Sequence, residues 1–149
     1  MDLVVDASVV VKWFVEEHGS EKAKLVMEDF AAQDVELHAP ALLPFEVLNA
    51  LRYHPGFSEE RLLSVEAALE RFAFHEHALR GEYARRAVHL SHSSDLAIYD
   101  ASYLALARTL GVKLVTADQA LVRVGGPDSF DLEAYTSASE DENLDARRT

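Results

Sequence analysis

Short apolar runs alternate along the chain with longer segments of helical pattern. The runs are apolar and often β-branched, as is typical of buried strands. They cover residues 3–6, 35–39, 74–78, 113–116 and 129–132. The helical segments cover residues 9–15, 20–33, 42–53, 59–72, 81–92 and 96–110, and a short one begins near residue 119. Because strands alternate with helices, the pattern predicts an α/β fold with one mainly parallel central sheet and helices on both faces.

The stretch at 96–108 is strongly helical, because it is rich in Ala and Leu. It carries one acidic residue, Asp100, near its start, among the apolar residues Ile98, Tyr99 and Ala101. A carboxylate in the first turn of a buried helix needs a partner. It either leans on the N–H groups and positive dipole end of the helix N-terminus or holds a cation. We therefore expect the role of Asp100 to indicate the function of the protein.

Polar residues mark where several of these helices begin. Asp6 or Ser8 is expected to cap the helix at 9–15. Residues 93–95, Ser-Ser-Asp, are expected to form a loop and cap before the helix that carries Asp100. The sequence Thr116-x-x-Gln119 resembles a capping box that opens a short helix.

Length and composition indicate one globular domain. The chain has 149 residues, of which 49% are apolar and 27% charged, which suits a single packed core. We expect the domain to cover residues 1–133 and the polar residues 134–149 to form a disordered tail. No apolar run reaches the ~20 residues of a membrane span, and the start lacks the basic residues of a secretory signal. The absence of cysteine fits a cytoplasmic protein.

The net charge of −12 argues against a surface that coats nucleic acid, because such surfaces need clustered Lys and Arg. It does not exclude a nuclease whose acidic residues surround a metal ion, since a divalent cation would invert the local field. An acidic body also fits a basic protein partner through electrostatic steering.

Three acidic residues fall where a ligand cleft of an open α/β sheet would use them. Asp6 ends the first strand, and Asp118 follows the strand at 113–116. Ligands in such sheets bind beyond the carboxyl ends of the strands. Asp100 begins the helix that precedes the second of these strands. The pattern therefore predicts that these carboxylates serve one site.

Glu46 is a fourth candidate, because it lies in an apolar helical stretch with Asn49 one turn further on. Carboxylates from distant segments can hold one or two Mg²⁺ or Mn²⁺ ions, which prefer oxygen ligands. Such ions activate water and neutralise charge on a phosphodiester. Taken singly, each of the four acids could instead cap a helix or lie exposed on one. For all four acids together, capping or exposure is the weaker explanation, because a helix cap does not require apolar neighbours.

Four blocks of sequence resemble the PIN-domain family, and within it the VapC-type toxins of toxin–antitoxin pairs. The blocks are Val-Val-Asp6-Ala-Ser8-Val, Glu46-Val-Leu-Asn49-Ala-Leu, Tyr99-Asp100-Ala-Ser-Tyr-Leu-Ala-Leu-Ala and Val-Thr116-Ala-Asp118. Each block is short, but all four in this order are specific. The resemblance covers about residues 1–132, nearly the whole domain.

The resemblance implies a function and the residues that perform it. The family's metal-binding quartet matches Asp6, Glu46, Asp100 and Asp118. Its supporting polar positions match Ser8, Asn49 and Thr116. The family cleaves RNA with Mg²⁺ or Mn²⁺, and its toxins are commonly homodimers that a cognate antitoxin inactivates by filling a groove near the site. The resemblance thus implies a cytoplasmic endoribonuclease toxin with an RNA substrate, an antitoxin partner, a homodimeric state and no membrane association.

Three residues near the matched blocks need separate interpretation. Relatives often carry a Ser or Thr cap close to Asp95, so we interpret Asp95 as a cap rather than an added acid. Lys12 and Arg52 follow two of the blocks and are candidate contacts to RNA phosphate, although solvated helix charges are the simpler interpretation.

Two pairs of histidines offer a less favoured alternative metal site. His75 and His77 share one side of a possible strand, and His89 and His92 lie one helical turn apart. Either pair could ligate Zn²⁺, but no third ligand is evident in the sequence.

Two other functions stay open from the residues themselves. A phosphotransfer domain could use Asp6. The haloacid-dehalogenase type needs a second Asp where this chain has Ser8, and the receiver type needs a Lys after a late strand, whereas Lys113 begins one. A PIN-like scaffold without activity would fit a chain that had lost acids, and this chain retains all four.

Overall fold

The structure is a computed structural model, and it describes residues 1–140. Its centre is one sheet with the strand order β3-β2-β1-β4-β5, in which every neighbouring pair is parallel. The strands are β1 (Asp2–Val5), β2 (Glu36–Pro40), β3 (His75–His77), β4 (Lys113–Thr116) and β5 (Ser129–Asp131). The predicted α/β fold with a mainly parallel sheet is therefore confirmed.

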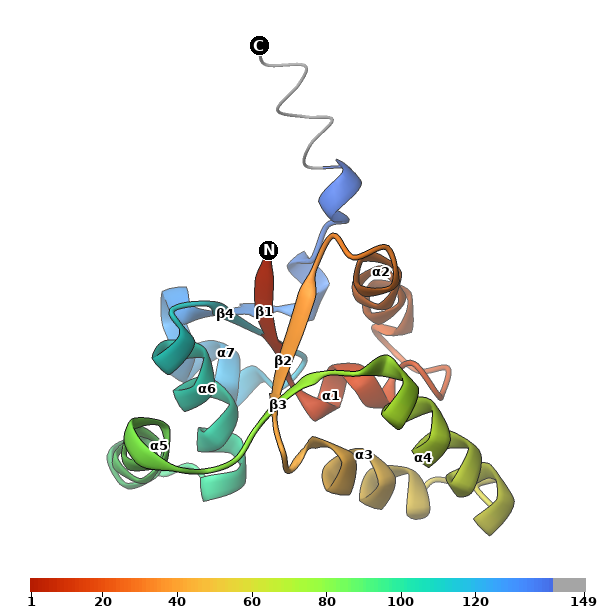
Figure 1. The fold of residues 1–149 in the computed structure, drawn as a ribbon, viewed down its shortest axis with the longest axis horizontal. Coiled ribbons are helices and arrows are strands. Elements are labelled where there is room, and N and C mark those ends of the chain that lie inside the picture. The colour runs from red at the N-terminus through yellow and green to blue at the C-terminus, as the bar shows by residue number, and fades with distance from the viewer. Residues whose placement is uncertain (141–149) are drawn as a thin grey trace.

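Helices follow the strands and cover both faces of the sheet. They are α1 (Ala7–Val11), α2 (Ser20–Ala31), α3 (Leu43–Arg52), α4 (Glu59–Phe72), α5 (Gly81–Ser94), α6 (Ile98–Leu110) and α7 (Gln119–Gly125), with short 3₁₀ turns η1 (Gly126–Asp128) and η2 (Leu132–Ala134). Figure 1 shows α5 and α6 on one side of the sheet and α2 and α4 on the other. None of the helices within residues 1–140 combines the length and apolar character needed to cross a membrane.

Helix α6 is the central helix of the core. Every residue from Ala101 to Ala107 is buried, because α6 lies between the strands β1, β2 and β4 and the outer helix α5. A helix that is apolar on all sides belongs in a core. The rigid packing of α6 therefore fixes its first turn, which carries Asp100 at the carboxyl edge of the sheet.

The chain between α5 and α6 differs from the prediction. Ser93 and Ser94 are the last residues of α5, and Asp95 is its C-terminal cap in the left-handed region, with φ of 53°. Asp is one of the residues that tolerate this conformation. Residue Ala97 precedes α6 without a side-chain cap bond. The predicted cap role of Asp95 thus applies to the end of α5 and not to the start of α6.

The predicted capping box at Thr116 and Gln119 is wrong. Asp118 caps α7, because its Oδ1 accepts from the N–H groups of Ala120 at 2.8 Å and Leu121 at 3.4 Å. Thr116 is instead the last residue of β4, and its side chain belongs to the site described below. The first helix also differs, since Asp6 precedes α1 without a side-chain cap bond.

The chain after residue 133 continues to pack against the domain. Tyr135 is 3% exposed, and its hydroxyl donates to Asp29 Oδ2 of α2 at 2.6 Å. Ser137 Oγ and the N–H of Ala138 also donate to the Asp29 carboxylate. The first residues of the predicted tail are therefore ordered by a buried acid, and the rest of that tail, residues 141–149, lies outside the described residues.

Candidate active site

The four predicted carboxylates lie at the carboxyl edge of the sheet. Asp6 follows β1 and Asp118 follows β4, which are neighbouring parallel strands. The N–H of Asp6 donates to the carbonyl of Val115 in β4 at 3.1 Å, which ties the two strand ends together. Asp100 and Glu46 lie in the first turns of α6 and α3. Four segments distant in sequence thus carry these acids to one region.

Asp6 is held by two hydroxyl groups. It is 6% exposed, and its Oδ2 accepts from Ser8 Oγ and from Thr116 Oγ1, each at 2.7 Å. The hydroxyls are themselves oriented by the following backbone, because the N–H of Ala117 donates to Ser8 Oγ and the N–H of Asp118 donates to Thr116 Oγ1. This network fixes the Asp6 carboxylate and leaves little freedom for its rotation.

Burial makes Asp6 hard to ionise. Loss of solvent raises its pKa to about 6, above the ordinary value of 3.8. The hydrogen bonds from Ser8 and Thr116 act in the opposite direction, because they stabilise the charged form. The nearby charges of Glu46 and Asp118 raise the pKa further. The pKa of Asp6 therefore depends on the charges of two of the other three acids.

The remaining acids are coupled in the same way. Burial raises the pKa of Glu46, the nearby Tyr103 hydroxyl acts to lower it, and the charge of Asp100 raises it. Burial also raises the pKa of Asp100, and the charge of Asp118 adds to this effect. Each of the four carboxylates thus interacts with at least one other, as expected of acids that share one site.

Glu46 leaves one oxygen unsatisfied. Its Oε1 and the hydroxyl of Tyr103 are both buried atoms without a hydrogen-bond partner within residues 1–140. Burial and the adjacent Glu46 charge raise the pKa of Tyr103, so this hydroxyl stays protonated. Buried polar atoms are rarely left without a partner, and an unmet acceptor often marks the place of a water or an ion. The two atoms are neighbours, because the Tyr103 hydroxyl acts on the Glu46 carboxylate, and rotation of that hydroxyl lets it donate to Glu46.

The four carboxylates are the kind of ligand that a hard cation prefers, but their side chains do not converge on one point. Four carboxylates and no sulfur or imidazole favour Mg²⁺ or Mn²⁺ over Zn²⁺. Within residues 1–140, no three metal-ligating side chains converge closely enough to hold an ion as they stand. Hydrogen bonds hold Oδ2 of Asp6 and Oδ1 of Asp118.

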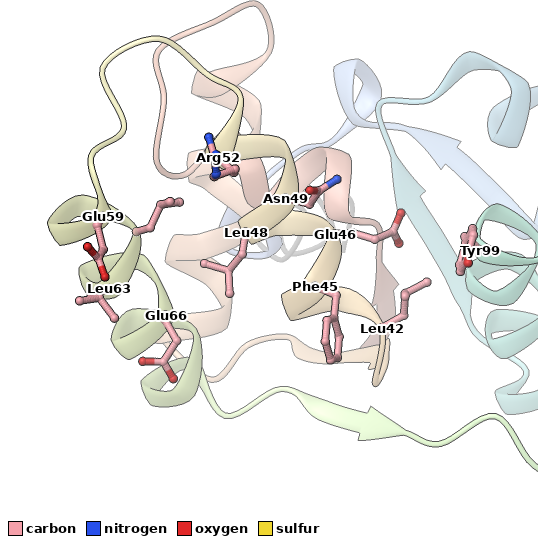
Figure 2. A pocket seen from close by; sticks show the side chains of 11 residues that line it. Leu42, Phe45, Glu46, Leu48, Asn49, Arg52, Glu59, Leu63, Glu66 and Tyr99 are labelled. Atoms are coloured by element: carbon pink, nitrogen blue, oxygen red, sulfur yellow. The ribbon is translucent and has the colours of Figure 1, made fainter.

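A pocket of about 770 Å³ extends from Glu46 along α3 and α4. Figure 2 shows Glu46 and Asn49 on the same helix, with Tyr99 of α6 facing them across the opening. Arg52 lies further along α3 in the same pocket. Much of the remaining lining is apolar, including Phe45, which is 75% exposed. The predicted residues Asn49 and Arg52 therefore line the pocket beside Glu46.

Comparison with known proteins decides the family. The family model described as PIN domain matches residues 3–127. This chain belongs to the PIN-domain family. It is 35% identical over 125 residues to ribonuclease VapC3 from Pyrobaculum aerophilum, a match that covers 81% of this chain and 92% of that protein. The predicted resemblance to VapC-type PIN domains is confirmed.

Solved structures show the same fold. One is a toxin–antitoxin complex from Klebsiella pneumoniae, with a TM-score of 0.66, 21% identity and coverage of 87% of this chain and 97% of that chain. Another is PAE2754 from Pyrobaculum aerophilum, with a TM-score of 0.64, 21% identity and coverage of 89% and 85%. At these identities the likeness concerns the fold of this PIN domain.

Lys12 and Arg52, the two candidate contacts of this PIN domain to RNA phosphate, differ in whether their side chains are already engaged. Lys12 Nζ donates to the carbonyl of His18 at 2.8 Å and to Glu17 Oε1 at 3.2 Å, and its side chain is 14% exposed. It therefore fastens the loop after α1. Arg52 is exposed and lies over the ring of Tyr53, so it is free to reach a ligand in the pocket beside Glu46.

The sequence did not reveal that Tyr103 of this PIN domain lies beside Glu46 or that His38 lies beside His75 and His77. The one signal for Tyr103 was its spacing, because it lies three residues after Asp100 on the same helix. His38 is paired in register with His75, and its Nδ1 lies 2.9 Å from Nε2 of His77. His75 Nε2 instead contacts Glu36 at 2.7 Å. These histidines form pairwise contacts, and within residues 1–140 no third ligand completes a Zn²⁺ site.

Proposed function

We propose that this PIN domain is a Mg²⁺- or Mn²⁺-dependent endoribonuclease and acts as the toxin of a toxin–antitoxin pair. The observation that carries the proposal is the set of four carboxylates whose charges act on one another at one edge of the sheet. The name of its relative, ribonuclease VapC3, supports RNA as the substrate. The cytoplasm remains the predicted location.

Asp6, Glu46, Asp100 and Asp118 would hold the cation. When bound, it would neutralise charge on the phosphodiester and polarise an attacking water. The hydroxyls of Ser8 and Thr116 keep Asp6 in one orientation.

The other polar groups have supporting roles. Tyr103 retains its proton and lies beside Glu46, so it can orient that carboxylate by donating to it. Asn49 and Arg52 line the neighbouring pocket, and we infer that they contact the RNA backbone. Lys12, which already has two partners, is a weaker candidate.

Asp100→Asn tests the proposal, because it removes one charge at nearly constant shape. We expect RNA cleavage with Mg²⁺ to fall by at least about a hundredfold, since the cation would lose a ligand. The thermal midpoint without metal should not fall, because repulsion from Asp118 is relieved. Cleavage of labelled RNA is measured with Mg²⁺ and with EDTA. A folded D100N protein that cleaves as fast as wild type contradicts the assignment.

An antitoxin partner and a homodimer are also part of the proposal. Phe45, Leu63 and Tyr99 line the pocket beside Glu46 and are each more than half exposed. Such an apolar opening suits a protein segment, and the similar Klebsiella pneumoniae structure is a toxin–antitoxin complex. Co-purification with the small protein of an adjacent gene tests the antitoxin partner. Light scattering of the purified chain tests the homodimer.

The alternatives have less support in the geometry. Asp6 is buried, with one oxygen engaged by two hydroxyls, whereas a phosphate acceptor must be approached by its donor. Lys113 lies at the opposite end of β4 from Thr116, so it cannot serve as the late lysine of a receiver domain. An inactive scaffold would not need four coupled carboxylates.

A further inference from the structure

A second pocket, of about 610 Å³, is lined by residues of α5, α6 and α7. None of its lining residues belongs to the candidate active site or to the pocket beside Glu46. Its cationic lining consists of Arg85 and Arg86 of α5 and Arg108 of α6, with His89 beside them. This concentration of guanidinium groups is unexpected on a chain with a net charge of −12.

The spacing along α5 creates a polar stripe. Positions 82, 85, 86, 89 and 93 recur at three- and four-residue intervals, so they share one face of the helix. They carry Glu82, Arg85, Arg86, His89 and Ser93. The adjacent face carries the buried residues of α5 that pack on the core, and one of them, Leu90, also lines the pocket. The stripe is therefore held rigidly on the surface.

The acids of this region are too few to neutralise it. Glu82 is shared by Arg85 at 3.4 Å and Arg86 at 3.1 Å. Arg108 pairs with Asp128 at 2.9 Å. Three guanidinium groups thus meet two carboxylates, and the Arg85 side chain is 72% exposed. The planar guanidinium of arginine can donate two parallel hydrogen bonds to phosphate oxygens.

The pocket lies on the helix pair that leads to the site. Residues 95–97 join α5 to α6, so Ser93 and Ser94 at one end of the pocket come shortly before Asp100 in the chain. We propose that this second pocket binds the phosphodiester backbone of an RNA at nucleotides away from the cleaved bond. The inference rests on the proposed ribonuclease function, and it adds a surface that selects longer RNA.

The test uses binding without cleavage. The probe is a labelled single-stranded RNA of about 30 nucleotides, and its affinity is followed by fluorescence anisotropy in EDTA over a series of salt concentrations. The R85Q/R86Q double variant should bind roughly tenfold more weakly at low salt. Its plot of log affinity against log salt should be shallower by about 0.7 for each phosphate that the variant no longer neutralises.

Two matched variants separate a local effect from a change in total charge. K24Q/R71Q removes two exposed cations on α2 and α4 and should bind like wild type. E82Q frees Arg85 and Arg86 from their shared acid and should bind RNA more tightly, a gain that misfolding cannot produce. Equal losses in both double variants, or no loss in R85Q/R86Q, overturn the proposal. So does an unchanged or lower affinity in E82Q.

Cleavage assays distinguish failure of this inference from failure of the proposed function. R85Q/R86Q should cleave a very short RNA at the wild-type rate but cleave the longer probe with a raised KM. If wild type cleaves neither RNA, the ribonuclease assignment fails while the binding result still decides the pocket. If R85Q/R86Q cleaves both the short and the longer RNA like wild type, the pocket does not bind the substrate.

Discussion

At the scale of single residues, Asp6 combines firm positioning with unfavourable ionisation. Two hydroxyls fix its Oδ2, yet burial raises its pKa to about 6. The charges of Glu46 and Asp118 contribute to that shift. Without a cation, the folded protein therefore holds a carboxylate that is easier to ionise in the unfolded chain. This is the electrostatic cost of a preformed anionic site.

That cost predicts how stability depends on pH. Because the folded pKa of Asp6 lies above its ordinary value of 3.8, the folded protein binds the proton more tightly. In EDTA, the contribution of Asp6 to the free energy of unfolding should fall as pH rises from about 4 to about 6, by on the order of 3 kcal/mol. Urea unfolding of wild type and Asp6→Asn over this range measures the difference.

The D6N variant serves as the reference because an amide oxygen can still accept from Ser8 and Thr116. D6N should be the more stable protein at neutral pH, and its advantage should shrink below about pH 4. A constant difference between the two proteins across the range contradicts the raised pKa.

At the scale of elements, helix starts position the acids. Asp118 caps α7, and Asp100 and Glu46 occupy the first turns of α6 and α3. The positive end of each helix dipole favours a carboxylate there. Short parallel strands then bring these helix starts to one edge of the sheet. A structural role and the proposed metal-binding role thus coincide in Asp118.

Two substitutions of Asp118 separate its roles. Asn caps a helix about as well as Asp, so D118N should keep the stability of wild type in EDTA or exceed it. D118A loses the bonds to Ala120 and Leu121 and should be less stable than D118N by about 1 kcal/mol. Both should bind Mn²⁺ much more weakly than wild type, as measured by calorimetry. Wild-type affinity in D118N removes Asp118 from the proposed metal ligands.

At the scale of the whole molecule, the four acids are linked through their charges rather than through a closed ligand shell. No three of the metal-ligating groups within residues 1–140 converge on one point. A bound cation would replace the repulsion among these carboxylates with attraction. Binding of this kind stabilises the folded state by mass action.

Mg²⁺ or Mn²⁺ should therefore raise the thermal midpoint of wild type. Binding to the folded state alone contributes about 2.7 kcal/mol when the free ion is at about 100 times its Kd. The double variant D6N/D100N keeps the shape of the site but lacks two charges, and its midpoint should not respond. Melting curves with millimolar Mn²⁺, and with Ca²⁺ to compare ion size, make the comparison. Equal shifts in both proteins indicate binding elsewhere.

The sequence by itself determined the elements and the identity of the candidate acids. The predicted helix at 59–72 and strand at 113–116 match α4 and β4, because periodicity and propensity act over neighbouring residues. The α/β order and the resemblance to the PIN family followed from the same local information. The predicted capping box at Thr116 was wrong because Asp118, two residues later, offers an alternative cap, and its side chain accepts from the first N–H groups of α7.

Only the tertiary structure decided which side chains meet. Thr116 reaches Asp6 across 110 positions of sequence, and Tyr135 reaches Asp29 across 106. Such pairs depend on strand order and helix packing, which local patterns do not encode. The same packing places the Tyr103 hydroxyl beside Glu46 and brings Arg108 to the basic face of α5. Sequence thus named the charged groups, and the fold determined the distances and burial that set their chemistry.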